Sequence, residues 1–154
     1  MLKVSINMKD TEAIAREFAA GLYRIKPKKG ALVVGLSGDL GAGKTAFTAL
    51  LGRELGIKSK INSPTFVIMK KYPLAGKNHK FLFHLDAYRL KNERELLHIG
   101  WEEIISNPEH LVFIEWPENV SKAMPKNSHY IRIDHTKEGH RKFKIKLSQG
   151  VIIF

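Results

Sequence analysis

Apolar side chains recur at two spacings along the chain, and each spacing predicts a different kind of element. From residue 14 they return every three or four positions, as on one face of a helix. The apolar positions of this segment are Ile14, Ala15, Phe18, Ala19 and Leu22. We predict an amphipathic helix here with Asp10 as its N-cap, since aspartate favours that position. Residues 26–30, Lys-Pro-Lys-Lys-Gly, end the helix.

Short, continuous apolar runs predict strands that are covered on both faces. Residues 31–36 and residues 111–115 are such runs, and the second ends in the carboxylate of Glu115. A second helix is predicted over residues 44–55, with Gly56 as its C-terminal stop. The buried strand at residues 31–36 is thus followed by the helix at 44–55, with a short loop between them.

Two further pairs of segments complete the pattern. Residues 66–72 and 80–86 predict a β-hairpin, with its loop at 73–79. Two short helices are predicted after it, at residues 92–98 and 101–106.

The last predicted hairpin pairs residues 129–134 with 141–147 across a turn at 136–139. Its second strand alternates apolar and basic residues, so one face is predicted to point inward. The inward residues are Phe143, Ile145 and Leu147, and the outward residues are Lys142, Lys144 and Lys146. Outward lysines are typical of an edge strand. Together the elements predict an α/β fold with a mostly parallel central sheet, flanking helices and antiparallel hairpin additions.

The loop between the first buried strand and the second helix carries the most specific motif. Residues 38–45 read Gly-Asp-Leu-Gly-Ala-Gly-Lys-Thr, which fills every fixed position of a phosphate-binding loop. Backbone N–H groups of such a loop converge on phosphate oxygens at a helix N-terminus. The predicted nucleotide-binding residues are Gly41, Ala42, Gly43, Lys44, Thr45 and Ala46. Lys44 is expected to bridge the β- and γ-phosphates, and the Thr45 hydroxyl to bind Mg²⁺.

Two carboxylates stand at the ends of apolar strands. Proteins with a phosphate-binding loop usually take a Mg²⁺ ligand from an acid at the end of a neighbouring buried strand. Glu115 ends one strand, and Asp86 ends another. We predict that Glu115 binds Mg²⁺ and that Asp86 supports the metal or the attacking water.

Three further residues, in or next to the segments named above, allow more than one interpretation. Thr65, in Ser63-Pro64-Thr65-Phe66, is either part of a proline turn or a hydroxyl that senses the γ-phosphate. His84 is more typical of a packed core histidine than of a catalyst. Trp116 is either a core residue or an aromatic wall beside the nucleotide.

Composition narrows the class of protein. At 154 residues with 44% hydrophobic content, the chain is predicted to form one domain, residues 1–154. It has no cysteine, which excludes disulfides, thiolate zinc sites and cysteine nucleophiles. No apolar run reaches the roughly 18 residues of a membrane span, and no signal peptide is recognisable, so we expect a cytoplasmic protein.

The net charge of +11 is uneven. Residues 1–85 carry 15 Lys/Arg against 5 Asp/Glu, residues 86–118 carry 3 against 8, and residues 119–154 carry 8 against 2. The basic ends are consistent with a solvated surface and equally with attraction to nucleic acid or an acidic partner.

Four motifs, in this order and spacing, resemble the TsaE (YjeE) family of bacterial P-loop ATPases. They are the loop at 38–45, Ser63-Pro64-Thr65-Phe66, His84-Leu85-Asp86-Ala87-Tyr88-Arg89 and Glu115-Trp116-Pro117-Glu118. The resemblance spans about residues 5–145. It departs from the family's pattern at Ala46, where a second threonine is common, and at Ala87, where a larger apolar residue is usual.

The resemblance implies a three-layer P-loop NTPase fold and a Mg²⁺-dependent ATPase of tRNA threonylcarbamoyladenosine synthesis. Such an ATPase acts with the proteins TsaB and TsaD, and meets tRNA through them. By matching motif positions, the implied metal-binding residues are Thr45, Asp86 and Glu115. The implied catalytic residues are Lys44, Thr65, Asp86 and Glu115. Met8 and Gly139 are implied as adenine contacts.

Two other functions share some of these features. A small-molecule kinase has the same loop but also an arginine-rich lid, which the sequence lacks. A nucleic-acid-binding module, with nucleotide as a switch, is consistent with the basic ends. No obvious arginine finger stands next to the motifs, although Arg89 after Asp86 is a candidate, so we also expect a partner to complete the site.

Overall fold

The computed structural model describes residues 1–62, 64, 68–76 and 78–148 of the chain. Its strands are β1 (Leu2–Ser5), β2 (Leu32–Ser37), β3 (Met69–Pro73), β4 (Phe81–Asp86), β5 (His110–Glu115), β6 (His129–His135) and β7 (Arg141–Lys146). Its helices are α1 (Met8–Arg24), α2 (Lys44–Glu54), α3 (Glu93–His98), α4 (Trp101–Ser106) and the 3₁₀ segment η1 (Pro117–Ala123). Within the described ranges, none of the helices has the length and apolar character that crossing a bilayer requires.

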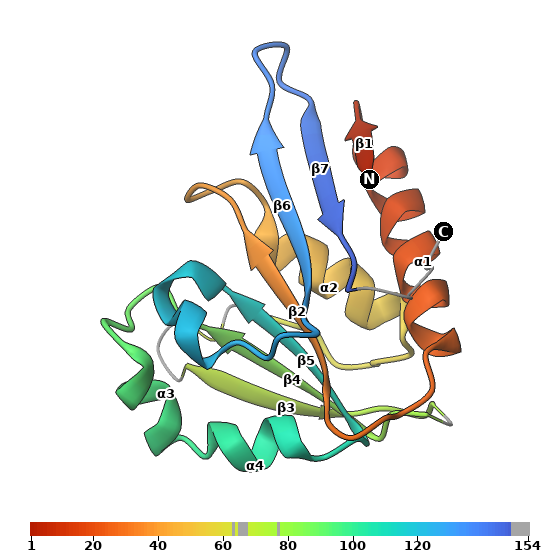
Figure 1. Cartoon of the computed structure of the whole chain (residues 1–154). Coiled ribbons are helices and arrows are strands. Elements are labelled where there is room, and N and C mark those ends of the chain that lie inside the picture. The colour runs from red at the N-terminus through yellow and green to blue at the C-terminus, as the bar shows by residue number, and fades with distance from the viewer. Residues whose placement is uncertain (63, 65–67, 77, 149–154) are drawn as a thin grey trace.

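All seven strands of the described residues join one sheet in the order β1-β7-β6-β2-β5-β4-β3 (Figure 1). The central strands β6, β2, β5 and β4 run parallel. The pairings β1–β7, β6–β7 and β3–β4 are antiparallel. The sheet is therefore mixed, and the prediction that it is mostly parallel is not confirmed. Antiparallel strands flank the parallel centre on both sides, because hairpins and the N-terminal strand extend it.

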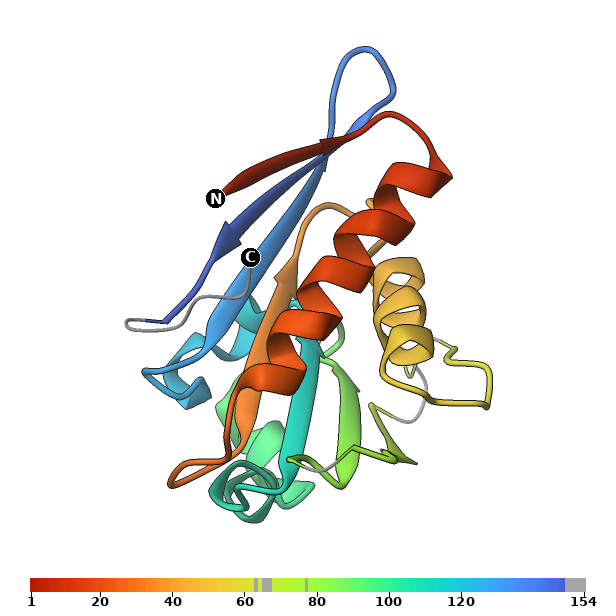
Figure 2. The same cartoon turned by 90° about the vertical axis from the view of Figure 1, so that its right-hand side faces the viewer.

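Helices cover both faces of the sheet, which confirms an α/β fold with helices flanking the sheet (Figures 1 and 2). On one face, Phe18 of α1 and Phe47 of α2 pack with Val34 and Leu36 of β2. On the other, Trp101 of α4 joins a cluster with buried residues of β2, β4 and β5. The two clusters exist because successive residues of a buried strand point to opposite faces.

The start of α1 differs from the prediction. Asn7, not Asp10, is the N-cap, and its side chain accepts a hydrogen bond from the Asp10 amide at 3.0 Å. The Asp10 carboxylate in turn accepts one from the Ile6 amide at 3.0 Å. Asp10 thus lies in the first turn, where it satisfies a backbone donor and a negative charge is favoured. Asn7 and Asp10 are both good capping residues, and only the backbone geometry distinguishes them.

The sequence prediction also missed β1, and with it the position of β7. β1 pairs with β7, so that Leu2 lies opposite Lys144 and Val4 opposite Lys142. β7 is therefore an inner strand, and the prediction that it forms an edge is wrong. Leu2 and Val4 are more than half exposed, so β1 carries no buried apolar pattern by which it could be recognised.

The bounds of β2, α2, β4, α3, α4, β5, β6 and β7 lie within one residue of their predicted bounds, whereas η1 was not predicted. Gly56 follows α2 with a φ of +83°, a conformation that glycine adopts without steric cost. β3 pairs with β4 in the first hairpin, although residues 66 and 67 of its predicted strand lie outside the described residues. The turn of the second hairpin closes through the Gly139 amide, which donates to the Thr136 carbonyl at 3.1 Å.

Candidate nucleotide-binding site

The phosphate-binding motif forms the connection from β2 to α2. Gly38, Gly41 and Gly43 have φ angles of +140°, +79° and +102°, which side chains disfavour. At Gly38 a Cβ would also lie 2.2 Å from the Ile133 carbonyl oxygen of β6. α2 begins at Lys44, and no side chain caps its N-terminus. The first amides of the helix can therefore bind an anion, and the positive end of the helix dipole also favours one there.

A pocket of about 280 Å³ lies beside this loop. It forms where β2, β4 and β5 end, because the carboxyl ends of parallel strands meet at one edge of the sheet. The lining residues are Leu40, Gly41, Gly43, Lys44, Thr45, Ala46, Asp86, Tyr88, Glu115 and Trp116. The fold thus brings most of the predicted site residues together. Ala42 is buried in the loop and does not line the pocket.

Glu115 is the polar centre of this pocket. Its carboxylate is almost completely buried, and its oxygens accept hydrogen bonds from the Thr45 hydroxyl at 2.9 and 3.0 Å. His84 lies 2.7 Å from the same carboxylate. These donors offset the cost of removing a charged group from water. The end of β5 and the first turn of α2 are thereby joined through two side chains from separate motifs.

Asp86 lies next to Glu115 in the sheet, since the two residues are paired in the register of β4 and β5. One carboxylate oxygen of Asp86 accepts a hydrogen bond from the Tyr88 amide at 2.9 Å. The side chain is largely buried and lines the pocket. Both predicted acids therefore lie at the same edge of the sheet as the phosphate-binding loop.

Lys44 is buried, and its ammonium group donates to the carbonyls of Gly38 and Asp39 at 2.7 and 2.9 Å. Burial lowers the pKa of Lys44, while the surrounding carboxylates, Glu115 foremost, partly oppose that shift. The Lys44 amine is thus held against the phosphate-binding loop, next to the place where we expect it to contact the phosphates.

Trp116 forms a wall of the pocket. Its ring centroid lies 4.3 Å from the Lys44 ammonium and 5.1 Å from the Tyr88 ring. Its φ of +58° is a strained conformation for a bulky residue, and its amide donates to the Leu36 carbonyl at 3.0 Å. Trp116 also packs against the apolar cluster that contains Trp101, so its position fits both the core residue and the pocket wall.

The oxygen donors fit a hard cation such as Mg²⁺. Thr45, Asp86 and Glu115 offer a hydroxyl and two carboxylates, which are ligand types that Mg²⁺ prefers. The described residues contain no group of three or more His, Cys, Asp or Glu side chains arranged for a metal. The protein would therefore supply part of a coordination shell, as is usual where substrate phosphates and water complete it.

The structure also places two side chains that sequence reasoning missed. A Cβ on Gly43 would lie 3.3 Å from the Arg141 side-chain nitrogen Nε, and His135 Nε2 lies 3.3 Å from the Gly41 carbonyl oxygen. Both residues belong to the β6–β7 hairpin, which rises beyond the loop in Figure 1. Their only sequence signal was a position beside the predicted turn.

Other nominated residues do not join this group. Met8 is more than half exposed at the start of α1. Gly139 is exposed in the hairpin turn, and neither residue lines the pocket. Arg89 does not line it either. Thr65 lies outside the described residues.

Comparison with known proteins decides the family. Residues 5–143 match the family described as threonylcarbamoyl adenosine biosynthesis protein TsaE. The chain belongs to the TsaE family. The TsaE proteins of Haemophilus influenzae and Bacillus subtilis are 33% and 35% identical to it over 120 and 137 residues. These alignments cover 78% and 89% of this chain, and 73% and 79% of the relatives.

The fold of this chain is also similar to a solved structure. The crystal structure of YdiB from Bacillus subtilis superimposes with a TM-score of 0.74 at 27% sequence identity. The superposition covers 96% of this chain and 85% of YdiB. The TsaE match includes the β2–α2 loop and the ends of β4 and β5, so the pocket lies within the family's shared region. The family's part in tRNA threonylcarbamoyladenosine biosynthesis therefore extends to this chain.

Proposed function

We propose that this chain hydrolyses ATP with Mg²⁺ and acts with TsaB and TsaD in the threonylcarbamoylation of tRNA, in the cytoplasm. The observation that carries the proposal is the hydrogen bond from Thr45 to Glu115 beside the uncapped N-terminus of α2. It joins a phosphate-binding surface to a carboxylate in a pocket of about 280 Å³. That combination supports a metal-bound nucleoside triphosphate over a simple anion.

Each residue has a role that its position supports. The amides of residues 41–46 bind phosphate oxygens, and Lys44 leaves its two carbonyl partners to contact the phosphates. Thr45 and Glu115 hold Mg²⁺, which neutralises phosphate charge when bound. Asp86 supports the metal shell or orients the water. Phosphoryl transfer needs little covalent chemistry from the protein, so positioning and charge are sufficient.

Partner dependence follows from the charges around the pocket. Among the described residues lining it, Lys44 is the one basic side chain, against the two acids Asp86 and Glu115. Arg141 adds a guanidinium beside the loop from the hairpin. We infer that further positive charge or closure comes from the TsaB–TsaD pair, as arginine fingers supplied in trans do elsewhere.

The test is ATP hydrolysis by the chain alone and with TsaB, TsaD and tRNA. We expect slow turnover alone, faster turnover in the complex, and loss of both in EDTA. Rapid hydrolysis by the isolated chain that partners do not change would contradict the partner role. Phosphate transfer to a metabolite instead of water would favour the kinase.

A second candidate function, direct tRNA binding, is supported by one surface. Arg132 lies opposite Lys144 in the β6–β7 pairing, and both are exposed, as is Lys146. Asp134 pairs with Arg132 at 2.9 Å and with Lys144 at 3.8 Å, so the three cations of this face stand against one acid. Cations on one face of a sheet attract a phosphate backbone. We expect such binding to weaken steeply with salt if it occurs. Affinity that does not depend on salt would exclude this contact.

A further inference from the structure

His84 lies in the middle of the site's supporting strand, β4, and is completely buried. Because side chains alternate along a strand, His84 shares its face with Leu82 and Asp86. Leu82 belongs to the apolar cluster under α1 and α2, whereas Asp86 lines the pocket. His84 therefore lies between the core and the pocket. It is two residues before Asp86, the acid of β4 that lines the pocket.

The contacts of the imidazole are unequal. Its Nε2 lies 2.7 Å from Glu115 Oε2, and because a carboxylate accepts hydrogen bonds, the ring N–H is the donor. Its Nδ1 is buried and has no hydrogen-bond partner among the described residues. Leaving a buried polar atom unpaired is costly, and an aliphatic side chain would avoid that cost. The gain that the structure shows for a histidine here is the hydrogen bond to Glu115.

Glu115 needs such a donor because of its surroundings. Asp86 is its partner in the β4–β5 register, so two carboxylates lie side by side at the strand ends. Like charges so placed repel one another. The Lys44 ammonium is occupied by the carbonyls of Gly38 and Asp39. His84 and Thr45 are thus the side chains seen to hold the Glu115 carboxylate.

We propose that His84 is a positioning residue of the metal site, holding Glu115 in the orientation in which it faces Thr45. This inference rests on the proposed Mg²⁺-dependent function, and it assigns His84 no contact with substrate. Residues behind a metal ligand commonly orient it, and their loss typically weakens metal affinity about 10- to 100-fold. The complete burial of His84 agrees with the interpretation of a packed core histidine that is not a catalyst, and the proposal adds a function for its ring N–H.

The experiment compares two substitutions of His84 with a matched control. H84L removes the donor at similar volume, whereas H84Q retains an N–H group near the position of Nε2. H129L is the control, because His129 is equally buried in β6 and does not line the pocket. The measurements are Mn²⁺ binding in the presence of ADP, followed by electron paramagnetic resonance, and ADP affinity without metal.

We expect H84L to weaken Mn²⁺ binding about 10- to 100-fold while leaving metal-free ADP affinity unchanged. H84Q should recover most of the Mn²⁺ affinity, and H129L should match the parent chain. The proposal is overturned if H84L binds Mn²⁺ as the parent does, if H84Q is as defective as H84L, or if H129L shows the same loss.

A double-mutant cycle keeps the proposal testable should H84L fold poorly. If His84 acts through Glu115, H84M, which lacks the N–H donor and has a flexible apolar side chain suited to a buried site, should weaken Mn²⁺ affinity less in an E115Q background than alone, since coupled residues are not additive. Full additivity would contradict the proposal. Failure of the parent chain to hydrolyse ATP, alone or with partners, would instead refute the proposed function, and the Mn²⁺–ADP measurement would still decide the role of His84.

Discussion

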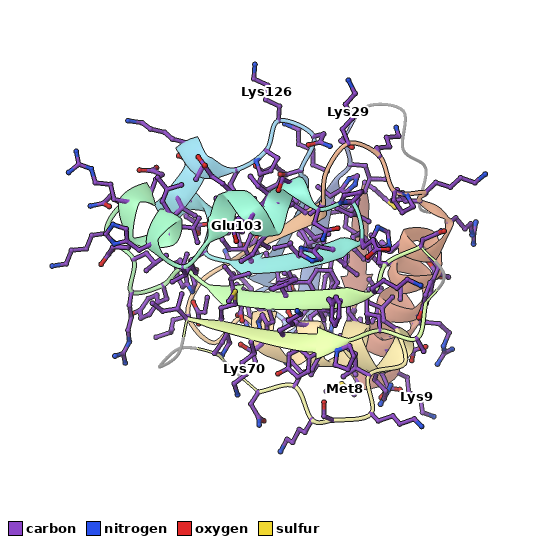
Figure 3. The ribbon with its side chains drawn as sticks, turned by 90° about the horizontal axis from the view of Figure 1, so that it is seen from below. Met8, Lys9, Lys29, Lys70, Glu103 and Lys126 are labelled. Carbon is purple, nitrogen blue, oxygen red and sulfur yellow. The ribbon has the colours of Figure 1, made fainter. Side chains whose placement is uncertain are left out.

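The two ends of the parallel strands carry pockets of similar size and different chemistry. The pocket at the carboxyl ends measures about 280 Å³ and combines two acids, a lysine and a helix N-terminus. A pocket of about 320 Å³ lies at the amino ends, beside His79 and His129. Its charged side chains are Lys26, Lys28 and Lys126, and its described lining contains no acid. In Figure 3, which views the molecule from below, Lys29 and Lys126 point outward from the ribbon.

Volume therefore does not distinguish a site from a hollow in this molecule. The carboxyl-end pocket joins a hydroxyl of α2 to a carboxylate at the end of β5 through the hydrogen bonds of Thr45 and Glu115, and the described lining of the amino-end pocket offers no such carboxylate. At the amino-end pocket, burial lowers the pKa of both His79 and His129 and so disfavours the charged form of each ring. Parallel sheets place ligands at the carboxyl ends, and the chemistry of the two pockets agrees with that rule.

The largest expected effect is that of Glu115→Ala on ATP hydrolysis. Removing a group that stabilises transition-state charge typically lowers kcat about 10²- to 10³-fold, and we expect a loss of that size with much of the ATP binding retained. Glu109→Ala is the matched control, since Glu109 is exposed just before the opposite end of β5. Steady-state kinetics in saturating Mg²⁺ measure both. Unchanged turnover in Glu115→Ala would refute the metal assignment.

Lys44→Ala should weaken ATP binding about 10- to 100-fold, the value of a hydrogen bond to a charged group. Lys126→Ala, in the amino-end pocket, should leave ATP affinity unchanged. Isothermal titration calorimetry with a non-hydrolysable ATP analogue compares the two directly. Equal losses would mean that general positive charge, and not the loop, attracts the nucleotide.

Two glycine substitutions distinguish the loss of stability caused by a steric clash from the loss caused by backbone conformation alone. Gly41→Ala places a Cβ in open space, so its cost is the left-handed conformation, about 1–2 kcal/mol. Gly38→Ala should destabilise the chain more, because its Cβ would meet the Ile133 carbonyl oxygen at 2.2 Å. Urea unfolding curves give both values. A Gly38→Ala variant as stable as Gly41→Ala would show that β6 can move away from the loop.

The smallest effect concerns pH. The folded pKa of His79 and His129 lies below the unfolded value of about 6.5, so the unfolded chain binds more protons once the pH falls below that value. Stability contributed by the neutral rings is complete above pH 6.5 and declines as the pH falls toward the folded pKa. Thermal unfolding between pH 7.5 and 5 should show a falling Tm, with a smaller slope in H129Q. An identical slope would assign the decline to other groups.

The sequence was sufficient for the parallel centre of the fold and for the pocket. The strand at 31–36, its glycine loop and the following helix were all predicted, as were the acids at two strand ends. It was insufficient for β1, whose exposed Leu2 and Val4 give no buried period, and for the N-cap, where Asn7 and Asp10 were equally suitable. Arg141 and His135 were missed because only the folded hairpin brings them to the loop.

By itself the sequence determined the local chemistry: a phosphate-binding loop, strand-end carboxylates and the family to which they belong. Local motifs are readable because glycine conformation, capping and apolar period depend on neighbouring residues. Only the tertiary structure decided which side chains meet. Thr45 and Glu115 lie 70 positions apart, and His84 and Glu115 lie 31 apart. Their contacts depend on the β4–β5–β2 register, which long-range packing sets and no local pattern encodes.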